Sequence, residues 1–161
     1  MYRPLVEQQL IIQKRFLSSG SASIVGWMRN NRRYQKVVDY MMPLCTQLEL
    51  CAFRHKSNSW GFEAFLSNGL SCFLDSRDES HIPLGIQIMD AMESVIPEWK
   101  HEDIFYAFGC MAARAKQVDR AFRYIKKAIE FDKDIIQHMA QDRDFENIHS
   151  DPDFLILLRA S

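Results

Sequence analysis

Apolar residues recur at intervals of three and four positions along most of the chain, which is the spacing of an amphipathic helix. No segment alternates apolar and polar residues convincingly over six positions, as a half-exposed β-strand would. Five prolines and six glycines are also few for a β-protein with many tight turns. The pattern therefore predicts an all-α fold.

The N-terminal part of the pattern predicts helices with two interruptions. The polar stretch SSGSAS is expected to break the first helix, and Ser23 is expected to cap the second through its hydroxyl group. Pro43 must kink or split the third, because proline removes a backbone donor from a helix interior. The predicted helices run from Pro4 to about Leu17, from Ser23 through Met28, and from Arg32 to Arg54.

The rest of the chain predicts further helices with short connections. The longest of these connections is the polar loop DSRDESHIP. Prolines mark two helix starts, since the missing N–H of proline is no loss in a first turn. The predicted helices are Ser59 or Trp60 to Leu74, Pro83 to Pro97, Glu102 to Lys116, Val118 to Phe131, Ile135 to Gln141, Phe145 to His149, and Pro152 to Arg159.

Small residues stand at positions of the 102–131 segment where a larger residue would bury more surface. Gly109 lies inside an apolar run, although glycine costs about 1 kcal/mol relative to alanine in a helix. Ala121 and Ala128 lie seven residues apart on one helical face. We expect two antiparallel helices to approach closely at these positions, with the larger residues Phe105, Phe108 and Ile125 filling the seam.

This segment resembles one tetratricopeptide repeat, whose signature places W-x2-L-G-x2-Y before A-x3-F and P. Glycine and both alanines match at the right spacing. Phe105, Ala112 and Lys133 replace the usual Trp, Tyr and Pro. The resemblance implies helical hairpins over residues 58–135, preceded by basic and more divergent helices over residues 1–57.

The C-terminal sequence resembles the segment that caps many bacterial tetratricopeptide arrays. The Asp151-Pro152 pair suits a helix start, with an aspartate cap and a proline in the first turn. The matching positions are Ala140, Asp142, Asp144, Phe145, Ile148, Asp151, Pro152, Phe154 and Leu157. The resemblance implies a single domain over residues 1–161, a right-handed stack of antiparallel helical hairpins closed by a capping segment over residues 136–161.

Charge is distributed unevenly although the formal net charge is only −1. Residues 1–60 contain nine Lys or Arg against three Asp or Glu, whereas residues 61–161 contain eleven against eighteen. The apolar runs are shorter than the roughly 20 residues of a membrane span, and the N-terminus lacks the pattern of a signal peptide. The four cysteines stand singly among apolar residues. We expect a cytoplasmic protein without a membrane partner.

Two basic clusters are the candidate binding sites. The first contains Arg29, Arg32, Arg33, Tyr34 and Lys36; the second contains Arg114, Lys116, Arg120, Arg123, Lys126 and Lys127 with one acid, Asp119. Each can be a solvated face, a surface for an acidic protein, or a surface for nucleic acid. Trp99 follows a proline, and it can line a groove or lie in the core.

Motifs for catalysis or for cofactor binding are not evident. His138, Asp142 and Asp134 could share a helix face, but no second histidine stands four residues away, so a solvated face is favoured over a metal site. The sequence GLSCF lacks the final glycine of a nucleophile elbow. We expect no metal, no cofactor and no enzymatic activity.

These patterns favour a protein-binding module. Its narrowest form is a bacterial immunity protein that covers the active site of a cognate toxin, by analogy with other small proteins of this type. The alternatives are a chaperone or adaptor for a secreted protein, and a helical-repeat protein that binds nucleic acid through the first basic cluster.

Overall fold

The computed structural model describes residues 20–42, 60–93 and 102–159. Within these ranges the backbone forms helices and turns and no β-strand, so the predicted all-α class is confirmed for the described residues. None of the helices in this part of the chain has the length and apolar character to cross a bilayer. The predicted division at residues 57/58 and 135/136 stays a prediction.

The helices follow the predicted order with small shifts at their ends. Two of them, α7 and α9, have the predicted bounds, whereas the predicted helix over residues 4–17, Pro43 and Pro97 lie outside the described residues. The helices are α2 (Gly20–Asn30), residues 34–42, α4 (Trp60–Ser76), η1 (Glu79–His81), α5 (Ile82–Glu93), α6 (Glu102–Arg114), α7 (Val118–Phe131), α8 (Ile135–Met139), η3 (Arg143–Ile148) and α9 (Pro152–Arg159).

One predicted boundary is wrong. Ser23 lies inside α2 and does not cap it, because α2 already begins at Gly20 within the SSGSAS stretch. Helix α2 packs along α4 and buries Val25 there, and such packing outweighs the weak local preference of serine for a helix end. Tertiary contact therefore extends this helix through residues that would break an isolated one.

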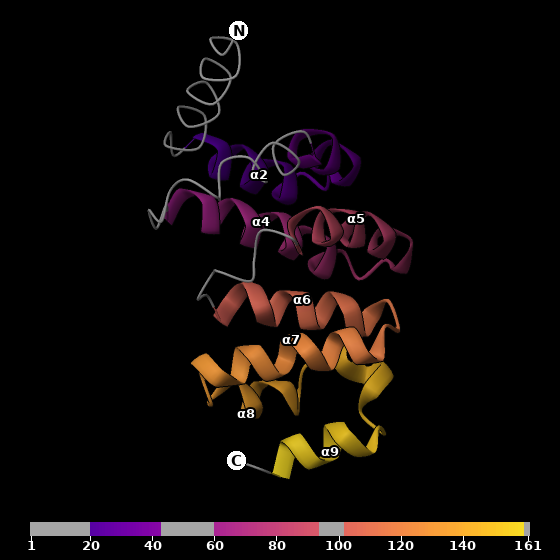
Figure 1. The fold of residues 1–161 in the computed structure, drawn as a ribbon. Coiled ribbons are helices and arrows are strands. Elements are labelled where there is room, and N and C mark those ends of the chain that lie inside the picture. Colours follow the sequence, from indigo (N-terminus) through magenta and orange to yellow (C-terminus); the bar gives the residue numbers. More distant parts are fainter. Residues whose placement is uncertain (1–19, 43–59, 94–101, 160–161) are drawn as a thin grey trace, which may run out of the picture.

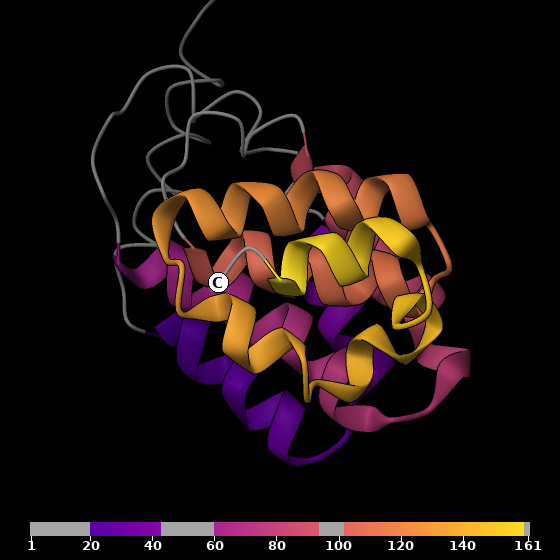
Figure 2. The ribbon, with the colours of Figure 1, turned by 90° about the horizontal axis from the view of Figure 1, so that it is seen from below.

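The helices succeed one another along one axis in chain order, from α2 at one end to α9 at the other (Figure 1). Helix α2 packs on α4, α4 packs on α5 and α6, and α6 packs on α7. Viewed from the C-terminal end, α8 and α9 lie in front of the rest of the molecule (Figure 2). The most extensive contacts join α6 to α7 and α2 to α4.

Helix α6 is the centre of the core. From Ile104 to Arg114 every residue except Tyr106 is buried, because α4, α5, α7 and η3 all pack against this one helix. Helix α7 buries one stripe, Ala121, Phe122, Tyr124, Ile125 and Ala128, and exposes its other face. Because α6 is buried on all sides, its sequence is strongly apolar. Helix α7 is buried on one face only, so its sequence mixes apolar and polar residues.

Gly109 lies against α7 at the seam between the two helices. A Cβ atom on Gly109 would lie 2.9 Å from Cγ1 of Ile125 and 3.7 Å from the backbone oxygen of Ala121. Ala121 and Ala128 are fully buried in α7. Phe108 packs edge-on against Tyr124 with ring centroids 5.1 Å apart. The small residues thus line the seam, and the aromatic rings fill its margin.

Three turns between consecutive helices contain a basic residue in the left-handed backbone region. The φ angles are 54° at Arg32, 53° at Arg77 and 59° at Lys116. The residue after Arg32 donates its N–H to Met28 O (2.9 Å), and the residue after Lys116 donates to Ala112 O (2.9 Å). These hydrogen bonds cap the C-terminal ends of α2 and α6. In most helices that end this way the left-handed position is occupied by glycine. Non-glycine residues are strained in this conformation.

Candidate functional site

In the first basic cluster, Arg29 and Tyr34 contact other parts of the fold, whereas the other three residues are exposed. Nε of Arg29 donates to Asp75 Oδ2 (2.6 Å), so this guanidinium ties α2 to α4. Tyr34 is half-buried, with its ring 4.0 Å from that of His81. Arg32, Arg33 and Lys36 are exposed, and no carboxylate of the described residues pairs with them.

Two exposed apolar side chains stand on α2 just before these three basic residues. Ile24 and Trp27 lie three residues apart, on one face of the helix, and Trp27 is 58% exposed. We call Ile24, Trp27, Arg32, Arg33 and Lys36 the N-terminal basic surface. It combines an exposed indole with three cations that meet no carboxylate of the described residues. Helix α2, which carries the indole, lies at one end of the described helices (Figure 1).

In the second basic cluster Arg120 and Arg123 are neutralised by acidic residues, whereas Lys116 and Lys126 are exposed and meet no carboxylate of the described residues. Nη2 of Arg120 donates to Asp90 Oδ1 and to Glu93 Oε2, at 2.7 Å each. Glu93 also pairs with Arg123 and accepts the hydroxyl hydrogen bond of Tyr124 (2.6 Å). Two acidic residues of α5 thus neutralise Arg120 and Arg123 of α7. Because these acids are distant in sequence, the run of basic residues in α7 suggests more unpaired positive charge than the helix has.

The pKa values in this group follow from the pairing. Burial alone would raise the pKa of Glu93, but the Tyr124 hydroxyl and the Arg120 and Arg123 guanidinium groups outweigh it and hold the pKa below its ordinary value. Burial opposes the charged form of Arg120, yet its bonds to Asp90 and Glu93 raise its pKa. The group is a stable ion-pair network at neutral pH.

The remaining predicted site residues do not form a second surface. Nζ of Lys127 lies 5.4 Å from the ring centroid of Phe105 and 5.8 Å from that of Tyr124, a cation–π arrangement that holds it against the helix seam. Trp99 lies outside the described residues. Arg114 is only 6% exposed, so its assignment to a surface cluster is wrong.

Arg114 belongs to a buried polar network between α4, α6 and the C-terminal segment. Its Nη1 donates to the carbonyl oxygen of Leu74 (2.9 Å), and its Nη2 donates to Glu79 Oε1 (2.9 Å). It therefore satisfies the last turn of α4, where backbone carbonyls lack helical partners and a positive charge is favourable. This bonding accounts for a charged side chain in the centre of the core.

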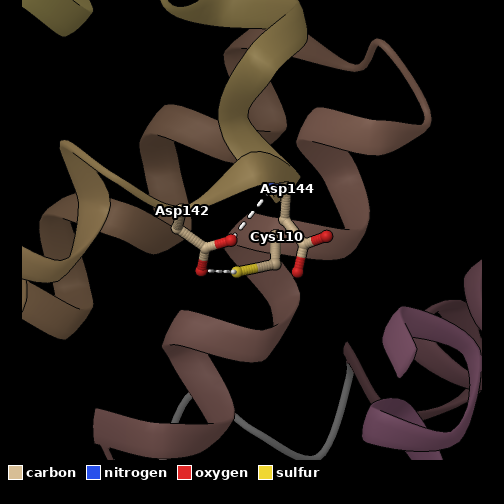
Figure 3. A group of neighbouring side chains, drawn as sticks. All are labelled: Cys110, Asp142 and Asp144. Carbon is tan, nitrogen blue, oxygen red and sulfur yellow. Dashed lines mark hydrogen bonds between the residues drawn. The ribbon is translucent and has the colours of Figure 1, made fainter. Parts of the chain in front are cut away.

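Next to Arg114 the network contains Cys110, Asp142 and Asp144, which point toward one another from α6 and η3 (Figure 3). Their potential ligand atoms lie within 4.8 Å of one another, close enough to be considered as a metal site. The sequence predicts Cys110 among apolar residues and Asp142 on a solvated face with His138. Asp142 is instead turned toward α6, whereas His138 and Asp134 are exposed.

Protein donors already occupy three of the four carboxylate oxygens of this cluster. Asp142 accepts the Tyr106 hydroxyl at Oδ2 (2.8 Å) and the Asp144 backbone N–H at Oδ1 (2.9 Å). Asp144 pairs with Nη1 of Arg77 at 2.5 Å. A cation would have to displace these donors beside two guanidinium groups. We therefore interpret the cluster as a latch that joins η3 to α6 and to the turn after α4.

The thiol and the phenol of the latch are held in their neutral forms. Burial raises the pKa of Cys110 well above its ordinary value, and the charges of Asp142 and Asp144 raise it further. Burial also raises the pKa of Tyr106, with added effect from Cys110 and from the hydrogen bond to Asp142. A protonated, buried thiol is a poor nucleophile, so the arrangement is suited to structure more than to covalent chemistry.

A sequence signal for this latch exists but is easily overlooked. Tyr106, Cys110 and Arg114 stand four residues apart, so they share one face of α6. Polar groups in such a row within an otherwise buried helix require a polar partner. That partner, the Asp142-x-Asp144 pair, lies about thirty residues further along, at a position that helical spacing does not reveal.

Comparison of the chain with family models, with curated proteins and with solved structures gives no match.

Proposed function

We propose that this chain is a non-enzymatic scaffold of tetratricopeptide-like helical hairpins that binds another protein. In this proposal the hairpins form a right-handed stack and residues 136–161 cap it. The close seam between α6 and α7, and the succession of helix pairs in chain order, support the repeat interpretation. Such stacks offer long surfaces assembled from successive helices, and their common use is to hold a partner.

The observation that carries the proposal is the N-terminal basic surface. Arg32, Arg33 and Lys36 have no acidic partner among the described residues, whereas Arg120 and Arg123 are neutralised by α5. Arg32 also occupies a strained conformation in which glycine would fit better. Tryptophan and arginine are the residues most enriched at binding hot spots, so an exposed Trp27 beside free cations fits an acidic protein surface.

The narrower form of the proposal is a cytoplasmic bacterial immunity protein that neutralises a cognate toxin by covering its active site. The concentrated positive charge of the N-terminal basic surface supports this form, because charge complementarity across an interface favours an acidic partner. An interface of the usual ~1,600 Å² requires only about 800 Å² from each partner.

Co-expression with the product of the neighbouring gene tests the proposal. We expect a complex on gel filtration and rescue of growth from the toxic partner. The variant Arg32→Glu/Arg33→Glu/Lys36→Glu should weaken binding at least tenfold, because three attractive contacts become repulsive. The matched control is Lys126→Glu on the exposed face of α7, which should bind normally. A triple variant that binds like the wild type contradicts the proposal.

Two other partners remain as alternatives, and each has its own signature. A chaperone or adaptor for a secreted protein would bind an extended peptide, so isolated fragments of the client would compete with the whole client. A nucleic acid would be favoured by free cations beside an exposed aromatic ring, and binding would be strongest at low salt. A gel shift with single-stranded and duplex oligonucleotides at 50 mM salt separates this alternative from a protein partner.

A further inference from the structure

The opposite end of the molecule has a surface that complements the N-terminal basic surface. On α9, Leu155 and Ile156 are exposed, and Ile156 is the most exposed of the large apolar residues in the described part of the chain, at 62%. Acidic side chains stand nearby in sequence, and one exposed cation, Arg159, follows Ile156 on the same face of α9. We call Glu146, Asp151, Asp153, Leu155 and Ile156 the C-terminal acidic surface.

The outward position of these apolar residues follows from how α9 is anchored. Phe154 is fully buried, with its ring 5.6 Å from that of Phe145 and 5.5 Å from that of His149. Leu157 and Leu158 are partly buried against the core. Because a helix turns by 100° per residue, this anchoring directs the two intervening residues outward. The helix that closes the chain thus retains an apolar outer face.

The two surfaces are complementary in their apolar residues and in their charge. Each contains a pair of exposed apolar residues, Ile24 with Trp27 and Leu155 with Ile156. Without Arg29, which Asp75 neutralises, residues 20–42 contain three Lys or Arg against one Asp. Without Asp142 and Asp144 of the latch, residues 132–159 contain five Asp or Glu against three Lys or Arg. Helices α2 and α9 lie at opposite ends of the described helices (Figure 1), so one chain cannot bring its own two surfaces together.

We propose that copies of this chain associate head to tail, with the N-terminal basic surface of one copy on the C-terminal acidic surface of the next. The contact is heterologous, because it joins two different patches and leaves one of each free at the ends. A symmetric contact between two N-terminal surfaces would place like charges opposite each other and is disfavoured.

This inference does not depend on the identity of the proposed partner. It has a consequence for that partner, however, because both use the N-terminal basic surface. A bound partner and a second copy of the chain therefore exclude each other.

Sedimentation velocity with the full chain measures the association. We expect the weight-average sedimentation coefficient to rise with protein concentration at 50 mM NaCl and to rise much less at 500 mM, where salt screens the charges. Trp27→Asp and Ile156→Asp each remove one surface and should each weaken self-association at least tenfold. Gln87→Asp, on an exposed position of α5, is the control and should associate like the wild type.

Mixing the two variants gives the decisive result. The Trp27→Asp chain keeps its acidic surface and the Ile156→Asp chain keeps its basic surface, so we expect a 1:1 dimer that grows no further. A wild-type chain that is monomeric at every concentration up to about 1 mM would overturn the inference. So would association that Ile156→Asp leaves unchanged, which indicates a symmetric contact. Either result leaves partner binding, measured by co-purification, as a separate outcome.

Discussion

Gly109 lies in the seam between α6 and α7, and a methyl group there must displace Ile125. A β-branched side chain in a helix has little rotamer freedom, so it cannot move aside easily. We expect Gly109→Ala to lower the free energy of unfolding by about 1 kcal/mol, because overpacking outweighs the gain of helix propensity. Denaturant titration followed by circular dichroism measures the change.

Gly85 on α5 provides a matched control for this substitution. A Cβ atom there would lie 2.6 and 2.5 Å from Sδ and Cε of Met111, and 3.3 Å from Cβ of Phe73. The methionine side chain is flexible and can take another rotamer. Gly85→Ala should therefore stay within about 0.5 kcal/mol of the wild type, since the gain in helix propensity offsets the adjustment. Equal destabilisation by the two variants would contradict the proposed role of the seam.

Lys116 ends α6 with a left-handed backbone conformation, at φ 59°. Glycine adopts this conformation without the strain of a Cβ atom, so Lys116→Gly should raise the free energy of unfolding by about 0.5–1 kcal/mol. The control is Lys126→Gly, in the interior of α7, which should lower it by about 1 kcal/mol. Thermal and denaturant unfolding of both variants check the opposite signs.

The burial of a single residue can be predicted from the sequence when the residues that determine it are close along the chain. The buried stripe of α7 follows from a simple 3.6-residue period, so Ala121, Ile125 and Ala128 could be predicted as inward-facing. Arg114 could not, because the carbonyl groups and carboxylates that satisfy it come from about 30 to 40 residues away. Its charge reads as surface until those partners are located.

At the scale of elements, Arg114 joins the C-terminal end of α4 to the α6 core. Arg114→Met keeps the length of the side chain but leaves two buried carbonyl oxygens and Asp144 with fewer donors. We expect a loss of about 2–4 kcal/mol in the free energy of unfolding. Denaturant titration measures this loss. Arg114→Lys should have a stability between those of the wild type and Arg114→Met, because an ammonium group cannot reproduce the planar set of donors of a guanidinium.

A double-mutant cycle identifies the latch more sharply than either single variant. Asp144→Asn removes the charge that Arg77 and Arg114 face. Since the residues belong to one network, the combined Arg114→Met/Asp144→Asn loss should be smaller than the sum of the separate losses, by 0.5 kcal/mol or more. Strict additivity would show that the latch is not a single unit.

Glu93 connects α5 to α7, and its pKa gives this connection a pH dependence. Because its folded-state pKa is below the ordinary value of 4.5, the ionised form stabilises the fold at neutral pH, and this contribution is lost as the pH falls through the folded-state pKa. Glu93→Gln should cost about 1 kcal/mol at pH 7, discounted for its partial exposure.

The test for Glu93 compares unfolding titrations at pH 7 and near pH 3. The difference between the wild type and Glu93→Gln should be largest at pH 7 and should shrink as the pH falls through the folded-state pKa of Glu93, below which both side chains are neutral. Glu130→Gln, on the exposed face of α7, serves as the control and should show little difference at either pH. A Glu93 difference that does not change with pH would contradict the ion-pair interpretation.

Helices themselves were easier to predict than their boundaries. The bounds of α7 and α9 follow from a strong apolar stripe and from the Asp151-Pro152 start, in which Asp151 accepts the Asp153 N–H (2.9 Å). The start of α2 could not be predicted, because packing against α4 holds Ser23 in a helix that its own preference opposes.

At the scale of the whole molecule, α6 has the most neighbours among the described helices. Helix α6 touches α4, α5, α7 and η3, whereas α2 packs mainly on α4 and α9 mainly on α8. We expect amide hydrogen exchange to be slowest in α6 and α7 and at least tenfold faster in α2 and α9, as local opening starts at the ends. Mass spectrometry of exchanged peptides measures the gradient, and uniform protection would contradict it.

The overall fold class could be predicted because helical spacing is present in nearly every segment. The distribution of free charge over the molecule could not, because it depends on which bases meet acids in space. Arg120 and Arg123 meet Glu93, and Arg32 and Arg33 meet no acid of the described chain. Two clusters that look alike in sequence therefore differ in what they can offer a partner.

The left-handed backbone at Arg32 sets the stability of the fold against the binding of a partner. Arg77, in the same conformation, is compensated by its bond to Asp144, but Arg32 has no such internal contact among the described residues. A library screened for heat resistance alone should accumulate glycine at position 32 and lose a guanidinium from the docking face. A library screened for binding should retain arginine there and tolerate the lower melting temperature.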